Sequence, residues 1–193
     1  MVTQPTPMRM SIEDYIALDS NSSEARYEFI DGYVYMLAGG TADHSTINGN
    51  LLAAFKSALR GGPCRVHTSD LKVQLSEKRY VFPDISISCD PRDRGKITVM
   101  QSPILIVETL SPSTETYNRG KKFSYYRACT SVQEYVLVDT QEQIIEVYRR
   151  DKEPFWKFSA FEAGERVELT SLDIHIPVSG VYEDVELPED TES

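Results

Sequence analysis

The chain has 193 residues, of which 40% are hydrophobic and 26% charged, a size and composition typical of one soluble globular domain. No apolar run approaches the roughly 20 residues that a transmembrane helix needs, so insertion into a membrane is not expected. The net charge of −10 argues against a protein that coats nucleic acid by bulk electrostatics. Six of the 30 acidic residues lie in 183–193, however, so the remaining 24 are nearly balanced by 20 Lys and Arg, which leaves room for a local basic face.

The organisation of the chain is expected to be simple. We predict a single folded domain over residues 1–187 and an acidic, disordered tail at 188–193. Residues 1–10 contain one Arg and two Pro but no apolar segment of a secretory signal, so we expect a cytoplasmic protein.

The cysteine pattern carries no sign of a metal or disulfide framework. Cys64, Cys89 and Cys129 are odd in number, widely spaced and free of any Cys-x-x-Cys pair, which is typical of reduced thiols. Cys64 and His67 form a lone pair without the second half of a zinc site, so a structural zinc is not expected.

The first elements in the chain are a short helix and a hairpin. Ser11 followed by Asp14 at the third helical position predicts a helix N-terminus. Two β-rich segments, 26–30 and 33–37, flank Asp31-Gly32, a strong signal for a two-residue hairpin turn. Glu28 would lie on the first of these strands.

The middle of the chain predicts a long helix followed by strands. Apolar residues recur at helical spacing from 43 to 60, and Gly61-Gly62-Pro63 ends that run. The segments 66–75, 80–88 and 104–110 are typical of strands, and we expect them to be neighbours in one sheet. A helix over 116–129 and three further strands follow, which predicts a mixed α/β order; those strands are expected near 134–138, 144–148 and 155–158.

Two carboxylates stand out against these strands. Glu108 closes the apolar run 104–107, where a buried carboxylate costs several kcal/mol unless a cation or strong donors lie close by. Asp84 opens the strand that continues through residue 88, and alternation puts it on a polar face with Ser86 and Ser88. If the strands are adjacent, Asp84 and Glu108 could together bind one Mg²⁺ and support hydrolysis of a phosphate ester.

A cationic partner is expected from the following helix, where Arg119, Lys122 and Tyr126 can share one face. Each residue also has a plainer interpretation. Lys121 and Lys122 could be solvated, Asp84 could cap a turn, and Glu108 could form a buried salt bridge to Arg119 or to a lysine.

Several motifs in this order resemble one known family. They are Tyr27-Glu28-Phe29-Ile30-Asp31-Gly32, His44, Phe82-Pro83-Asp84, Ile106-Val107-Glu108-Thr109-Leu110-Ser111-Pro112-Ser113-Thr114, Arg119-Gly120-Lys121-Lys122-Phe123-Ser124-Tyr125-Tyr126 and Glu134-Tyr135-Val136-Leu137-Val138-Asp139. Over roughly residues 10–180 the chain resembles the Uma-two family of restriction endonucleases, within the PD-(D/E)XK nuclease superfamily.

The resemblance implies a restriction-endonuclease-like α/β core, with a central mixed sheet flanked by helices. It implies that Asp84 and Glu108 are metal ligands for Mg²⁺, with Mn²⁺ as a substitute, that Lys122 is the catalytic lysine and that Glu28 is an outer carboxylate. The chain departs from the Glu-x-Lys motif, because position 110 is Leu110 and Lys122 would have to take its place. His44 also matches a family position, and its plainer interpretation is helix capping.

We therefore expect a Mg²⁺-dependent DNA endonuclease, acting as a homodimer if it cuts both strands. A catalytically inactive nuclease-fold module for nucleic-acid or protein interaction is the alternative that the missing Glu-x-Lys favours. A hydrolase of small phosphate compounds lacks support, because the chain has no Gly-x-x-x-x-Gly-Lys loop.

Overall fold

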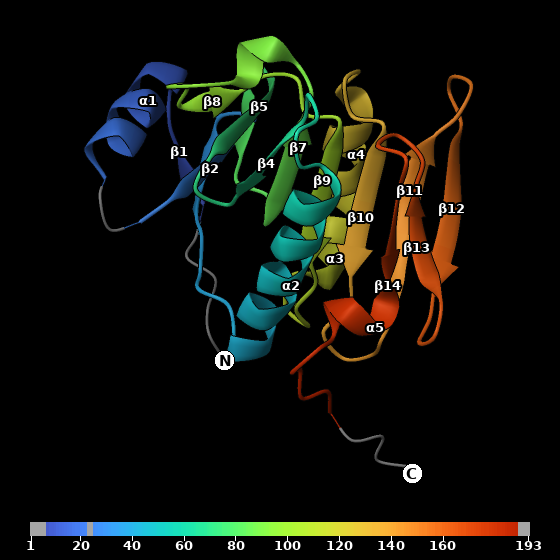
Figure 1. The fold of residues 1–193 in the computed structure, drawn as a ribbon. Helices are drawn as coiled ribbons and strands as arrows, with labels where there is room; N and C mark the ends of the chain where they lie inside the picture. Colours follow the sequence, from blue (N-terminus) through green and yellow to red (C-terminus); the bar gives the residue numbers. More distant parts are fainter. Residues whose placement is uncertain (1–6, 23–24, 189–193) are drawn as a thin grey trace.

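The computed structural model describes residues 7–22 and 25–188, and it has the mixed α/β fold that the sequence predicts (Figure 1). One six-stranded sheet, sheet A, has the order β1-β3-β2-β6-β5-β8, and a second, sheet B, has the order β12-β11-β10-β9-β7-β4. The strands of sheet A are β1 (Met8–Arg9), β2 (Tyr27–Ile30), β3 (Tyr33–Met36), β5 (Lys72–Ser76), β6 (Arg79–Val81) and β8 (Val99–Met100). Those of sheet B are β4 (Arg65–Thr68), β7 (Ile85–Ser88), β9 (Leu105–Thr109), β10 (Glu134–Val138), β11 (Ile145–Arg150) and β12 (Trp156–Phe161).

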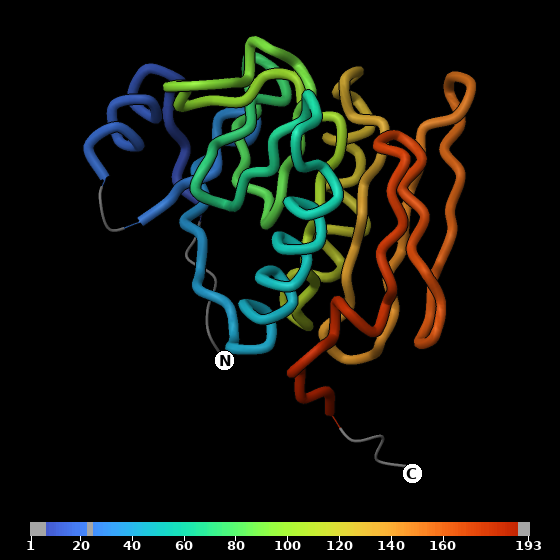
Figure 2. Tube along the Cα trace, viewed as in Figure 1, coloured from blue at the N-terminus to red at the C-terminus, as the bar shows by residue number. Residues whose placement is uncertain are grey.

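Helices and a small hairpin pack around the two sheets, with the first helix against sheet A. The helical segments are α1 (Ile12–Asn21), α2 (Ala42–Ala58), the 3-10 turn η1 (Pro91–Asp93), α3 (Glu115–Tyr117), the π-helical turn η2 (Asn118–Lys122), α4 (Phe123–Ala128) and α5 (Val178–Val181). The hairpin consists of β13 (Arg166–Leu169) and β14 (Ile174–Pro177). Tracing the chain in Figure 2 shows α2 and the C-terminal hairpin on the near side of sheet B, with the yellow-green helical segment behind it.

The central strands of sheet B, β7, β9 and β10, are buried on both faces, which explains their apolar sequences. On one face, Ile47, Leu51 and Phe55 of α2 pack with Val107 and Val136 and with the β13–β14 hairpin. On the other face, residues of β9 and β10 pack against α4 and against strands of sheet A. The central parallel pair, β9 beside β10, therefore lies in the middle of the molecule.

The N-terminal elements confirm the sequence predictions. The Ser11 side chain accepts a hydrogen bond from the Asp14 backbone N–H and caps α1. Strands β2 and β3 pair in antiparallel fashion around Asp31 and Gly32, which have φ of 52° and 91°. These positive values are the conformation that a tight hairpin turn requires.

The strands predicted over 66–75 and 80–88 are only partly correct, because each is broken in two. The first part of segment 66–75, β4, pairs in sheet B with the second part of segment 80–88, β7. The remaining parts, β5 and β6, pair with each other in sheet A. The expectation that all of these residues lie in one sheet was therefore wrong. The paired strands pass together from one sheet to the other, so β7 lies beside β9 but β6 lies beside β2.

The helix expected over 116–129 is present as three consecutive segments, α3, η2 and α4. The π-helical turn in the middle carries Asn118 and Lys122, both buried. Such π-helical turns are rare in proteins, but those that occur are often found at functional sites. The extra residue in the turn redirects the side chains that follow.

The cysteine prediction was wrong for two of the three residues. Cys64 and Cys89 form a disulfide, and only Cys129 is free. Arg65 pairs with Ser88 across β4 and β7, and the two cysteines are the next residues along that antiparallel register. The two cysteines are 25 positions apart in the sequence, so they become neighbours only when β4 and β7 pair.

No helix in the part of the chain that the structure describes is long and apolar enough to cross a membrane. The tail predicted at 188–193 lies, apart from Pro188, outside the described residues.

Candidate active site

Three buried charged side chains from three different elements meet between the sheets. The ammonium of Lys122 in η2 lies 2.9 Å from Oε1 of Glu108 in β9 and 3.2 Å from Oε1 of Glu28 in β2. Each of the three side chains is at most 8% exposed. Glu28 also accepts a hydrogen bond from the backbone N–H of Phe82, which joins sheet A to the chain just before β7. Lys122 thus neutralises carboxylates that belong to two separate sheets.

A tyrosine completes the surroundings of Glu108. The hydroxyl of Tyr126 in α4 donates to Oε1 of Glu108 at 2.5 Å, the same oxygen that accepts from Lys122. Tyr126 packs against Tyr135 of β10, with ring centroids 4.8 Å apart, and the Tyr135 hydroxyl donates to the backbone carbonyl of Asn118 in η2. The two tyrosines therefore brace both the carboxylate and the turn that carries the lysine.

The electrostatics of this cluster follow from burial and from an excess of acid. The pKa of Glu108 is raised to about 7, mainly by burial and also by the nearby charges of Asp84 and Glu28, against the lowering effect of Lys122. Burial acts to lower the pKa of Lys122, but Glu108 and Glu28 more than compensate and raise it. Burial, and then Glu108, raise the pKa of the Tyr126 hydroxyl, so this hydroxyl is a donor. Glu108 thus lies in a place that a further cation would stabilise.

Asp84 lies at the edge of the same cluster. Strands β7 and β9 are antiparallel with Ile85 opposite Val107, so the next pair in that register is Asp84 and Glu108. Residues directly opposite on antiparallel strands have Cβ atoms about 4.5–5.5 Å apart. Oδ2 of Asp84 accepts the backbone N–H of Thr109 at 2.8 Å, and the Asp84 side chain is 18% exposed, more than Glu108.

The N-terminal part of α2 adds polar side chains beside Asp84. Nε2 of His44 lies 3.4 Å from Oδ2 of Asp84, and Nδ1 of His44 lies 3.2 Å from Nδ2 of Asn48. Oδ1 of Asn48 accepts from the hydroxyl of Thr109 at 2.7 Å. The hydrogen bond to Asp84 raises the pKa of His44, against the opposing effect of burial. Sequence reasoning did not find Asn48 or Thr109, because an Asn inside a helix and a Thr after a glutamate are common.

Other sequence-predicted positions lie elsewhere. Arg119 pairs with Glu115 at 2.8 Å and with Glu146, so it does not share the site face of Lys122 and Tyr126, and that expectation was wrong. Arg119 and Lys122 both lie in the π-helical turn, whose wider spacing changes the α-helical relation between residues three apart. Lys121 is exposed, as its plainer interpretation predicts, whereas Lys122 is buried.

The polar face predicted for β7 is present but not solvated. Ser86 and Ser88 are at most 2% exposed. Ser88 is hydrogen-bonded to Asp93 at 2.8 Å. The strand therefore belongs to the core, and only Asp84 at its start reaches the site.

The carboxylates of this site fit a hard divalent cation that takes only some of its ligands from the protein and the others from water. Among residues 7–22 and 25–188, no group of three or more His, Cys, Asp or Glu side chains is arranged to hold a metal ion. Mg²⁺, however, is usually bound through one or two carboxylates and keeps several waters. The adjacent Asp84 and Glu108 meet that requirement, and within the described residues the side-chain hydrogen bonds of these carboxylates go to Oδ2 of Asp84 and Oε1 of Glu108, not to Oδ1 or Oε2.

The fold matches that of a solved nuclease-like protein. The crystal structure of a protein from Anabaena variabilis, described as a putative nuclease belonging to DUF820, superposes with a TM-score of 0.75 over 90% of this chain and 98% of the other. The two sequences are 20% identical, so this likeness concerns the fold. The chain therefore shares the mixed α/β fold of that protein.

The sequence places the chain in a particular family. A model of the Uma2 family, described as "Putative restriction endonuclease", matches residues 12–179, and the chain belongs to this family. Two relatives come from Synechocystis sp. The protein slr1290 is 37% identical over 175 residues, covering 90% of this chain and 92% of its own, and sll1609 is 26% identical over 173 residues, covering 88% and 96%.

Proposed function

We propose that the protein is a Mg²⁺-dependent DNA endonuclease whose site consists of Asp84, Glu108, Lys122 and Glu28. The observation that supports it best is the convergence of strand-borne carboxylates and one buried lysine from separate elements. Membership of the restriction-endonuclease family supports DNA as the substrate. A chain of this kind would cut both strands most simply as a homodimer.

Each side chain has a role in this proposal. Asp84 and Glu108 would hold the cation, and the cation would supply polarisation of a phosphate oxygen and a more acidic bound water. Lys122, which contacts Glu108, would add a fixed positive charge where charge develops on the phosphate, a role typical of transition-state stabilisation. Glu28 orients Lys122 from sheet A, and Tyr126 holds Oε1 of Glu108.

The alternative is a nuclease-fold module that binds nucleic acid or protein without cleaving it. Leu110 in place of a strand lysine, and a Lys122 already engaged with two carboxylates, favour this alternative. Incubation of the purified protein with plasmid DNA in Mg²⁺, Mn²⁺ or EDTA separates the two. Cleavage that requires the metal and disappears in Asp84→Asn supports the endonuclease. DNA binding without cleavage in any metal supports the inactive module.

A further inference from the structure

The imidazole of His44 is held by two neighbours in its own segment. A Cβ atom at Gly40 would lie 2.6 Å from Nδ1 of His44 and 2.9 Å from its Cγ, so a side chain at position 40 would displace the ring. One helical turn onward, Nδ2 of Asn48 lies 3.2 Å from the same Nδ1. The His44 side chain is 21% exposed. The ring therefore has a defined orientation although it lies near the surface.

Helix capping does not explain this arrangement. Thr41 is the N-cap of α2, and its hydroxyl accepts the backbone N–H of His44. The His44 side chain has no part in that cap. Its ring points instead toward the carboxylate before β7.

The hydrogen bonds define which nitrogen carries the proton in the neutral ring. Nδ2 of Asn48 is a donor, so Nδ1 of His44 accepts and the hydrogen lies on Nε2. The Asn48 amide is itself oriented, because its Oδ1 accepts from the Thr109 hydroxyl. The backbone N–H of the same Thr109 donates to Oδ2 of Asp84. The contacts therefore form a closed ring. Asp84 contacts His44, His44 contacts Asn48, and Thr109 bonds to both Asn48 and Asp84.

We propose that His44 and Asn48 position Asp84 for cation binding. Both donors, Nε2–H of His44 and the backbone N–H of Thr109, face Oδ2, which leaves Oδ1 as the oxygen offered to a metal ion. This is the pattern of outer partners that orient metal ligands in other proteins. The inference rests on the proposed function, since it presumes that Asp84 is a ligand. Gly40 is part of it, because any larger residue would move the ring.

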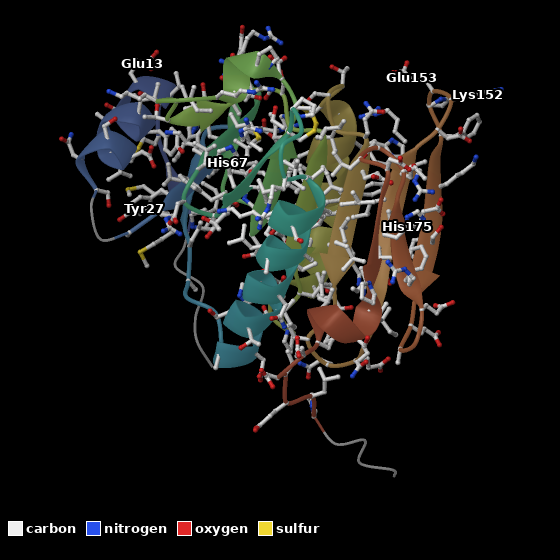
Figure 3. All side chains as sticks on the ribbon, viewed as in Figure 1. Glu13, Tyr27, His67, Lys152, Glu153 and His175 are labelled. Atoms are coloured by element: carbon white, nitrogen blue, oxygen red, sulfur yellow. A yellow bond between two sulfur atoms is a disulfide. The ribbon has the colours of Figure 1, made fainter. Side chains whose placement is uncertain are left out.

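Mn²⁺ affinity without DNA gives a direct test. Titration calorimetry of the purified protein with Mn²⁺ alone should show binding weakened about 10- to 100-fold in His44→Asn, whose amide is too short to reach Asp84. His44→Gln carries its amide nitrogen at the level of Nε2, so it should bind Mn²⁺ within about threefold of the wild type. Asn48→Ala should weaken binding in the same direction as His44→Asn. His175→Asn is the matched control, because His175 is exposed on β14 (Figure 3).

Each outcome decides a different question. Equal Mn²⁺ affinity in the wild type, His44→Asn and Asn48→Ala overturns the positioning role, and a loss in His44→Gln as large as in His44→Asn does so too. A wild type that binds no Mn²⁺ defeats both this inference and the metal site. If Mn²⁺ affinity depends on His44 but the wild type cleaves no DNA, the positioning role stands and the proposed endonuclease activity is wrong. Thermal melts of each variant exclude unfolding as the cause of a loss, and Asn48→Ala tests the ring of contacts if His44→Asn does not fold.

Discussion

The Lys122 ammonium, 2.9 Å from Glu108, is the single cation in direct contact with that buried carboxylate among the residues that the structure describes. The same ammonium contacts Glu28, so one positive charge faces two carboxylates and does not balance both of them. Asp84 adds a third negative charge nearby. The net negative charge is compatible with a divalent cation, and it adds to burial, the main cause of the raised pKa of Glu108.

Asp84→Asn should abolish metal-dependent DNA cleavage while leaving the fold intact. The asparagine can still accept the Thr109 N–H through its carbonyl, but it is a much weaker ligand for Mg²⁺ because it carries no charge. Cleavage assays across a titration of Mg²⁺ and Mn²⁺, together with circular dichroism, measure both effects. Wild-type cleavage rates in the variant would show that the nuclease activity comes from another site or from a contaminant.

Lys122→Met should reduce cleavage at least about 100-fold and should also destabilise the metal-free protein by about 3–5 kcal/mol. It leaves Glu28 and Glu108 buried without their shared cation. Lys121→Met is the matched control, because Lys121 is the exposed neighbour and should change cleavage and stability little. Kinetics below the melting temperature and urea unfolding measure the two quantities. Equal losses in both variants would contradict the assignment of Lys122.

Tyr126→Phe removes one hydroxyl from a fully buried side chain and should cost about 1.5–3 kcal/mol, the range for a hydrogen bond to a charged group. Without this donor the pKa of Glu108 should rise further. Tyr135→Phe, which removes a bond to a neutral carbonyl, should cost less, about 0.5–1.5 kcal/mol. Urea unfolding at several pH values compares them. A Tyr126→Phe protein as stable as the wild type at pH 7 would show that Glu108 does not depend on this hydroxyl.

The stability of the metal-free protein should depend on pH through Glu108. Its pKa is about 7 in the folded state against an ordinary value of 4.5, so the folded protein binds this proton more tightly than the unfolded chain does. Protonation of Glu108 therefore contributes fully to the free energy of unfolding below about pH 4.5. This contribution is lost as the pH rises through 7, a change of about 3 kcal/mol at most. Glu108→Gln removes this component, so the wild type should lose stability relative to the variant over that interval.

The same pair of proteins tests metal binding at pH 7. Mg²⁺ at about 100 times its Kd should stabilise the wild type by about 2.7 kcal/mol, and the Glu108→Gln variant by much less. Thermal melts in EDTA and in Mg²⁺ give both values. A large loss of stability in the variant at every pH, with no effect of Mg²⁺ on the wild type, would mean that Glu108 has only a structural role.

Much of this arrangement could be predicted from local sequence. Glu108 stands out because a charge ends an apolar strand, and the Asp31-Gly32 turn specifies a hairpin by its backbone requirement alone. The long apolar strands and the 43–60 helix were also evident, because their periodicity reports burial directly.

The rest depends on contacts between distant segments. The crossing of β4–β5 and β6–β7 between two sheets, and the Cys64–Cys89 pairing, follow from strand register that no local pattern encodes. The π-helical turn could not be foreseen either, and it decides that Lys122 and not Arg119 faces Glu108. The contact between His44 and Asp84 joins residues 40 positions apart, and it needs both α2 and β7 in place.

The Glu28–Lys122–Glu108 contact also acts as a cross-brace, since Glu28 belongs to one sheet and Glu108 to the other. Buried ion pairs of this kind are often less stabilising than apolar side chains of the same volume. A triple variant with well-packed apolar residues at these three positions is therefore a natural choice for engineering a more thermostable scaffold. The same substitution would remove every charge on which the proposed chemistry depends, so in this protein selection for stability alone would erode the site.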